Sequence, residues 1–98
     1  MKDLVKAIGD LAESMSGLAR RAVAEYAPIV DAIVREGSND VRRIEHTLDG
    51  LLDFCFYPEA LLLFKKLCRH YFSVDPAATA DYVRTYREMW ESELDIQK

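Results

Sequence analysis

The sequence predicts an all-α fold, a four-helix bundle whose long N-terminal helix is kinked near Pro28. Apolar residues recur at the helical spacing of three and four along the whole chain, whereas valine and isoleucine never alternate with polar residues over the length of a strand. Only four glycines occur. Ninety-eight residues make one domain, 1–98, and at this size roughly two thirds of the surface of the unfolded chain can be buried without a metal or a disulfide.

The first predicted helix is long, from about residue 3 to residue 36. With residues placed 100° apart, its apolar side chains fall on one stripe about 160° wide. Proline normally ends or kinks a helix, but the stripe keeps its phase past Pro28, so we expect a kink here and not a turn. Gly37 then suits the position that closes the helix. The stripe consists of Leu4, Val5, Ile8, Leu11, Ala12, Met15, Leu18, Ala19, Ala22, Val23, Tyr26, Ile29, Val30, Ile33 and Val34.

Two shorter helices follow, and the chain is expected to reverse between them. Asn39 and Asp40 are typical capping residues at the start of the second helix. A helix that continued through Pro58 would turn its apolar stripe about 160° away from the stripe before that proline. A reversal at Tyr57 and Pro58 brings the two stripes together and places Pro58 at the first position of the third helix.

A fourth helix is expected from residue 76 to about residue 94. Asp75 suits the capping position before it, and Pro76 suits its first position. Residues 95–98 are expected to fray.

The lengths of these helices do not match. At 1.5 Å per residue the first helix is about 50 Å long, and the other three are about 22 to 28 Å long. Either the kink folds residues 29–36 back over the bundle, or a second copy of the chain packs against the stripe of residues 4–34. Leu62 adds to the expected contact, because it lies outside the stripe of its own helix and between Lys65 and Arg69. The predicted partner-binding residues are Leu4, Ile8, Leu11, Met15, Leu18 and Leu62.

Aromatic side chains suggest an alternative function. A row of them at helical spacing on the fourth helix could stack a flat ligand, and the corner before Pro58 supplies further rings. Rows of this kind more often pack in a core. The predicted ligand-binding residues of this alternative are Phe54, Phe56, Tyr57, Tyr82, Tyr86 and Trp90.

Residues that suit metal or acid–base chemistry are few. Cys55 and Cys68 fall on apolar stripes and lack the paired spacing of a zinc site, so we expect them to pack in the core. His46, Asp49 and Asp53 project away from the apolar stripe and are expected to face water. The sequence contains no phosphate-binding glycine loop and no recognised nucleophile motif. It therefore predicts no metal, no cofactor and no enzymatic activity.

Charge and hydropathy restrict the partners. The net charge of −4 is spread evenly and no segment is a basic arm, which disfavours nucleic acid. A third interpretation is a dimer that sets Arg42 and Arg43, or Lys65, Lys66 and Arg69, against DNA phosphates. Charges interrupt every stretch of membrane-spanning length, and no secretion signal is visible.

These observations together predict a small cytoplasmic helical module for protein interaction or regulation. Its cysteines are expected to be reduced. Its partner is expected to be itself, as a homodimer, or another protein, and no membrane is involved.

Overall fold

The computed structural model describes residues 2–91 and confirms the all-α class. The chain forms α1 (Lys2–Glu36), α2 (Val41–Leu52), α3 (Pro58–Val74) and α4 (Pro76–Trp90), and these residues contain no strand. The predicted extension of the fourth helix to residue 94 and the fraying of residues 95–98 lie outside the described residues.

Backbone hydrogen bonds close the turn after α1. The Ser38 N–H donates to the Ile33 carbonyl at 3.0 Å, and the Gly37 N–H donates to the Val34 carbonyl at 3.2 Å. This pattern is the Schellman motif, which places one residue in the left-handed region. Gly37 has a φ of 63°, and glycine adopts this conformation without a steric clash because it has no Cβ atom. Its predicted role as the closing residue is confirmed.

Capping side chains and prolines start the other helices where the sequence predicts. Asp40 Oδ1 accepts a hydrogen bond from the Arg43 N–H at 3.2 Å, and Asp75 Oδ1 accepts one from the Ala78 N–H at 3.0 Å. Pro58 opens α3, where its missing N–H costs no helical hydrogen bond. The starts of α2, α3 and α4 therefore follow from local signals.

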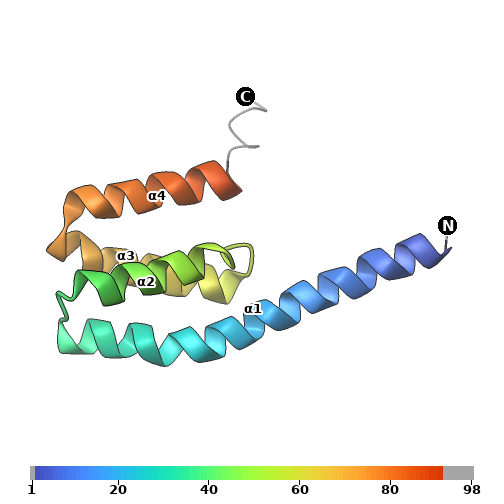
Figure 1. The fold of residues 1–98 in the computed structure, drawn as a ribbon, viewed down its shortest axis with the longest axis horizontal. Helices are drawn as coiled ribbons and strands as arrows, with labels where there is room; N and C mark the ends of the chain where they lie inside the picture. The colour runs from blue at the N-terminus through green and yellow to red at the C-terminus, as the bar shows by residue number, and fades with distance from the viewer. Residues whose placement is uncertain (1, 92–98) are drawn as a thin grey trace.

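The two prolines at residues 28 and 58 act differently, as predicted. Pro28 lies inside α1, which Figure 1 shows as one bent but unbroken helix. A proline inside a helix removes one backbone hydrogen bond and crowds the preceding turn, which kinks the helix. At the second proline the chain reverses, because Tyr57 has extended backbone angles, φ −97° and ψ 123°, just before α3 begins.

α3 lies at the centre of the molecule and packs against the other three helices. In Figure 1, α1 runs along one side of α3, α4 runs along the other side, and α2 lies over α3. The molecule measures 17 Å in its thinnest direction, against 52 Å in its longest. A helix with its side chains is about 10 to 12 Å across, so only two layers of helices fill this depth. Within the described residues, the side of α3 away from α2 has no helix over it.

The core lies between α2, α3 and the C-terminal half of α1. α4 covers its edge and contributes one buried residue, Thr79. Cys55 and Cys68 are free thiols buried in this core, which confirms the packing role predicted for them. The largest fully buried side chains are Val30, Ile33, Ile44, Leu48, Leu51, Leu67 and Tyr71.

The N-terminal half of α1 has no such neighbours. We call residues 3–18 the arm, and none of its side chains is buried. Figure 1 shows this part of α1 projecting beyond the ends of the other helices. Residues 29–36 lie along the bundle, where Val30 and Ile33 are fully buried, and the kink leaves the arm projecting from it (Figure 1). The sequence predicted that a partner covers the whole stripe of residues 4–34. This prediction was wrong for the second half of the stripe, because other helices of the same chain cover it.

Candidate functional site

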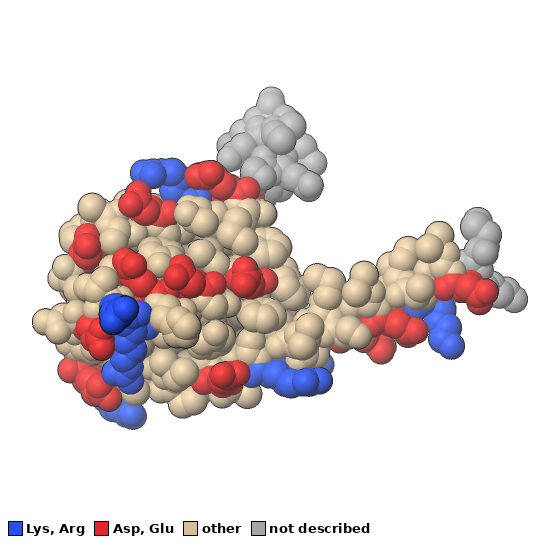
Figure 2. Space-filling view, in the orientation of Figure 1, with Lys and Arg blue, Asp and Glu red and all other residues tan. Residues whose placement is uncertain are grey.

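A continuous row of apolar side chains follows the arm. Its members are spaced alternately four and three residues apart, which keeps them on one face of a helix. Between 44% and 70% of each is exposed. Figure 2 shows uncharged surface along one side of the arm and charges along the other. We call this set the apolar row: Leu4, Ile8, Leu11, Met15 and Leu18, with Val5 beside them.

The charges of the arm are distributed unequally around it. With residues placed 100° apart, Asp3 and Asp10 fall about 120 to 140° to one side of the apolar row, and the uncharged Gly9 falls about 120° to the other side. Lys6 and Glu13 lie opposite the row. The row is therefore bordered by an acidic flank on one side and an uncharged flank on the other.

The arm is uncovered because the neighbouring helices are short. α1 contains 35 residues, whereas α2, α3 and α4 contain 12, 17 and 15. At 1.5 Å per residue, about half of α1 extends past the helices beside it.

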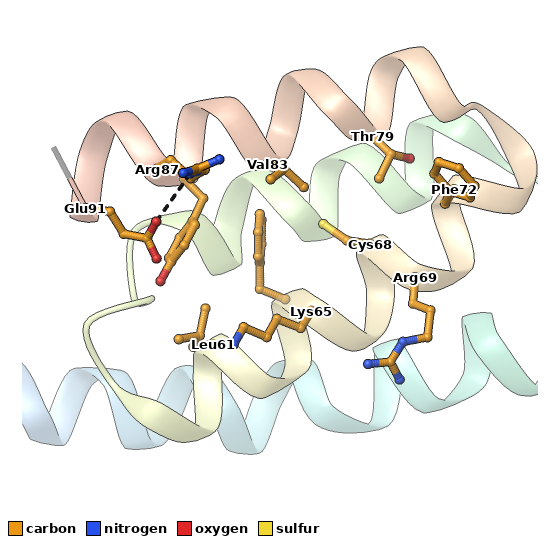
Figure 3. A pocket seen from close by; sticks show the side chains of 11 residues that line it. Leu61, Lys65, Cys68, Arg69, Phe72, Thr79, Val83, Arg87 and Glu91 are labelled. Atoms are coloured by element: carbon orange, nitrogen blue, oxygen red, sulfur yellow. Dashed lines mark ion pairs between the residues drawn. The ribbon is translucent and has the colours of Figure 1, made fainter. Parts of the chain in front are cut away.

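A second apolar surface is a groove between α3 and α4, with α2 behind it (Figure 3). Its volume is about 520 Å³. The buried side chains of Phe64, Cys68 and Thr79 contribute to it, and Phe72 and Val83 are its exposed apolar members. We call it the α3–α4 groove. Its lining consists of Leu61, Phe64, Lys65, Cys68, Arg69, Phe72, Thr79, Val83, Tyr86, Arg87 and Glu91.

Charged side chains border this groove. Lys65 and Arg69 belong to α3, and neither forms an ion pair with another described residue. On α4, Arg87 Nε lies 3.4 Å from Glu91 Oε1, the pair marked in Figure 3. The α3 side of the groove is therefore cationic, and the α4 side is balanced.

Two of the cations considered for DNA phosphates make ion pairs between elements instead. Lys66 Nζ donates to Asp31 Oδ1 at 2.7 Å and joins α3 to α1. The hydrogen bond and the charge of Lys66 lower the pKa of the Asp31 carboxyl below its ordinary value. Arg43 Nη1 lies 3.2 Å from Glu36 Oε1 and joins α2 to the end of α1.

The structure divides the aromatic residues of the alternative ligand site between separate places. Trp90 packs against Phe56 with ring centroids 5.9 Å apart, and Phe56 packs against Phe54 at 6.5 Å. The Trp90 indole N–H donates to the Leu52 carbonyl at 2.9 Å and fixes the end of α4 on α2. Tyr57 is half-buried at the start of α3.

The two tyrosines of α4 also have separate roles. The Tyr82 hydroxyl donates to Asp49 Oδ1 at 2.8 Å, and its ring lies edge-on to Tyr71 at 6.4 Å. Tyr86 packs against Phe64 at 5.8 Å and lines the α3–α4 groove. Burial raises the pKa of both α4 tyrosines above the ordinary value. Of the six predicted ligand residues, Tyr86 is the one that lines this groove.

Leu62 is 65% exposed, as the sequence predicts. It lies on α3 but does not line the α3–α4 groove, and it is not part of the arm. The structure therefore does not bring it together with the other five predicted partner-binding residues.

Sequence reasoning missed the α3–α4 groove. The signal that could have found it lies on α3, where Leu63 and Phe72 are about 180° apart around the helix. An apolar face about 180° wide is wider than that of a helix that packs against one neighbour only. It indicates a central helix with more than one apolar surface to cover.

Among residues 2–91, no three or more His, Cys, Asp or Glu side chains are grouped as metal ligands would be. Neither α1 nor any of the three helices after it combines the length and the apolar content that crossing a bilayer requires. Comparison of the chain with protein-family models, with curated proteins and with solved structures finds no match.

Proposed function

We propose that this protein is a small cytoplasmic helical interaction module that binds a second protein chain through its arm. The observation that carries the proposal is the apolar row, six large side chains exposed on a helix that projects from the bundle. A contiguous exposed apolar patch commonly marks a site of interaction with another protein or a ligand. The two cysteines of the protein are free thiols, which supports a cytoplasmic location because the cytoplasm keeps thiols reduced.

Burial of the apolar row can drive this association. Full burial of a large apolar side chain contributes about 1.5 to 3 kcal/mol. On average, slightly more than half of a side chain in the row is exposed, so a partner that covers the row gains about 0.9 to 1.8 kcal/mol from each, or about 5 to 11 kcal/mol in all. Association itself costs about 4 to 15 kcal/mol. A complex that buries two rows is therefore much more stable than one that buries a single row.

A second copy of this chain is the partner that we propose. In a two-fold symmetric dimer each contact occurs twice, so two arms contribute to one complex. The dimer would also stabilise the arm, because a free helix of about 16 residues is marginal in water.

Sedimentation equilibrium at micromolar concentration tests this proposal. The expected mass is twice the chain mass of 11.2 kDa. Leu11→Glu places a carboxylate in the apolar row and is expected to give a monomer with unchanged helical circular dichroism. Lys6→Gln changes the net charge by the same amount on the opposite face, and it is expected to remain dimeric. A wild-type protein that sediments as a monomer, or a Leu11→Glu variant that stays dimeric, would contradict the proposal.

A second candidate function is the binding of a small apolar ligand in the α3–α4 groove. The observation that favours it is the size of the groove, about 520 Å³, which falls within the range of ligand sites. Phe64 and Tyr86 could contact a flat ring there. Native mass spectrometry of the purified protein is expected to show a retained molecule as added mass, and the bare chain mass alone would count against this candidate.

A further inference from the structure

We infer that the arm of one copy docks in the α3–α4 groove of a second copy, and that two copies exchange arms. This inference rests on the proposed homodimer and adds the place where each arm binds. The mode is helix-in-groove recognition, in which an amphipathic helix lays its apolar face into an apolar groove.

The two surfaces match in length. The apolar row from Leu4 to Leu18 spans about 21 Å at 1.5 Å per residue. The α3–α4 groove follows α3 from Leu61 to Phe72, which is about 17 Å. The groove therefore accepts about three turns of the arm, the part that carries most of the row.

The charges of the two surfaces are complementary. The arm has its acidic flank at Asp3 and Asp10, and the groove has its cationic side at Lys65 and Arg69. The uncharged flank of the arm then faces α4, where the two charged residues that line the groove, Arg87 and Glu91, pair with each other. Opposite charges beside a buried apolar contact select the partner and its orientation.

The arm cannot reach the groove of its own chain. α1 is a continuous helix from Lys2 to Glu36, and the structure contains no break between the arm and the part of α1 that packs in the bundle. The arm projects away from the bundle (Figure 1). A second copy offers the same groove to an arm that needs no change of conformation.

The buried area also favours arm in groove over arm against arm. At about 25 cal/mol per Å², the exposed part of one apolar row corresponds to about 300 Å² of apolar surface. Two rows facing each other bury about 600 Å², which corresponds to a total interface of about 1,000 Å² because interfaces are about 60% apolar. Phe72 and Val83 add roughly 100 Å² for each groove, which raises the total to about 1,300 Å². Stable interfaces bury about 1,200 to 2,000 Å².

Two matched valine variants test the groove. Val83, in the groove, is 40% exposed, and Val41, at the start of α2 and outside the groove, is 42% exposed. Val83→Glu is expected to weaken dimerisation at least tenfold in sedimentation equilibrium, whereas Val41→Glu is expected to leave it unchanged. Circular dichroism and thermal melting check that each variant folds. If Val83→Glu does not fold, Phe72→Ser takes its place, because Phe72 is 61% exposed.

A mixing experiment tests the exchange itself. Leu11→Glu disables the arm but leaves the groove intact, and Val83→Glu disables the groove but leaves the arm intact. Each variant alone is expected to be monomeric. Mixed in equal amounts, they are expected to associate more strongly than either variant alone and more weakly than the wild type, because the heterodimer keeps one intact arm in one intact groove. Isotope labelling distinguishes the two chains in native mass spectrometry.

The outcomes separate this inference from the function on which it rests. A monomeric wild-type protein overturns both. A wild-type dimer that Leu11→Glu disrupts and Val83→Glu leaves intact supports the interaction module but overturns docking in the groove, and indicates pairing of two arms instead. A mixture of the two variants that associates no more strongly than either variant alone also overturns the exchange.

Discussion

The same substitution at two positions of α1 is predicted to have very different effects on stability. Ile8 and Ile33 lie on the same apolar stripe of one helix. Ile33 is fully buried between α1, α2 and α3, whereas Ile8 lies on the arm and is 60% exposed. Replacing each by alanine removes the same atoms from two different environments.

The expected magnitudes follow from burial. Ile33→Ala removes buried methyl groups and leaves a cavity, which typically costs about 2 to 5 kcal/mol. For a domain of this size, a loss of about 3 kcal/mol lowers the midpoint of thermal unfolding by roughly 12 to 24 °C. Ile8→Ala removes mainly exposed surface, and alanine has the higher helix propensity. Its expected cost in the isolated chain is below about 0.5 kcal/mol.

Urea unfolding followed by circular dichroism measures both variants. At low protein concentration, we expect a large fall in the transition midpoint for Ile33→Ala and almost none for Ile8→Ala. At higher concentration, the wild type is expected to gain stability by dimerising through the arm, and Ile8→Ala is expected to lose part of that gain. Equal destabilisation by the two variants at low concentration would refute the assignment of the arm as an exposed surface.

Three further predictions concern the body of the fold. Gly37→Ala is expected to lower the free energy of unfolding by about 1 to 2 kcal/mol, because at φ 63° a Cβ atom clashes with the backbone. An unchanged midpoint of urea unfolding would contradict the left-handed turn. The pKa of Asp31 is lowered by Lys66, so this pair stabilises the fold above the ordinary carboxyl pKa and loses its contribution as the pH falls through the folded pKa. Lys66→Gln is therefore expected to raise the pKa of Asp31 towards its ordinary value in an NMR titration. Burial raises the pKa of Cys55 to about 12 and that of Cys68 to about 11. At pH 8 both thiols are therefore expected to react only slowly with a thiol reagent until denaturant is added. Rapid reaction in the native state would contradict their burial.

Much of this fold was predictable because its signals are local. Asp40, Pro58 and Asp75 mark helix starts, and Gly37 marks a helix end, through interactions with residues at most five positions away. The different effects of the two prolines also followed from sequence, because the apolar stripe keeps its direction past Pro28 and reverses at Pro58.

The candidate sites were predictable only in part. The apolar row was expected, but so was a partner along the whole stripe to residue 34. The side chains on either side of residue 19 have the same character, and what separates them is whether a neighbouring helix extends that far. The alternative interpretation placed the aromatic residues around one pocket, whereas Trp90 and Tyr82 hydrogen-bond to α2.

By itself, the sequence determined the class, the number and starts of the helices, and the direction of each apolar face, because these depend on side-chain spacing and on contacts within a few residues. The tertiary structure alone decided which part of α1 is covered and where the α3–α4 groove opens. Both depend on how helices of unequal length pack side by side, and periodicity along one helix does not specify which neighbour, if any, lies against its apolar face.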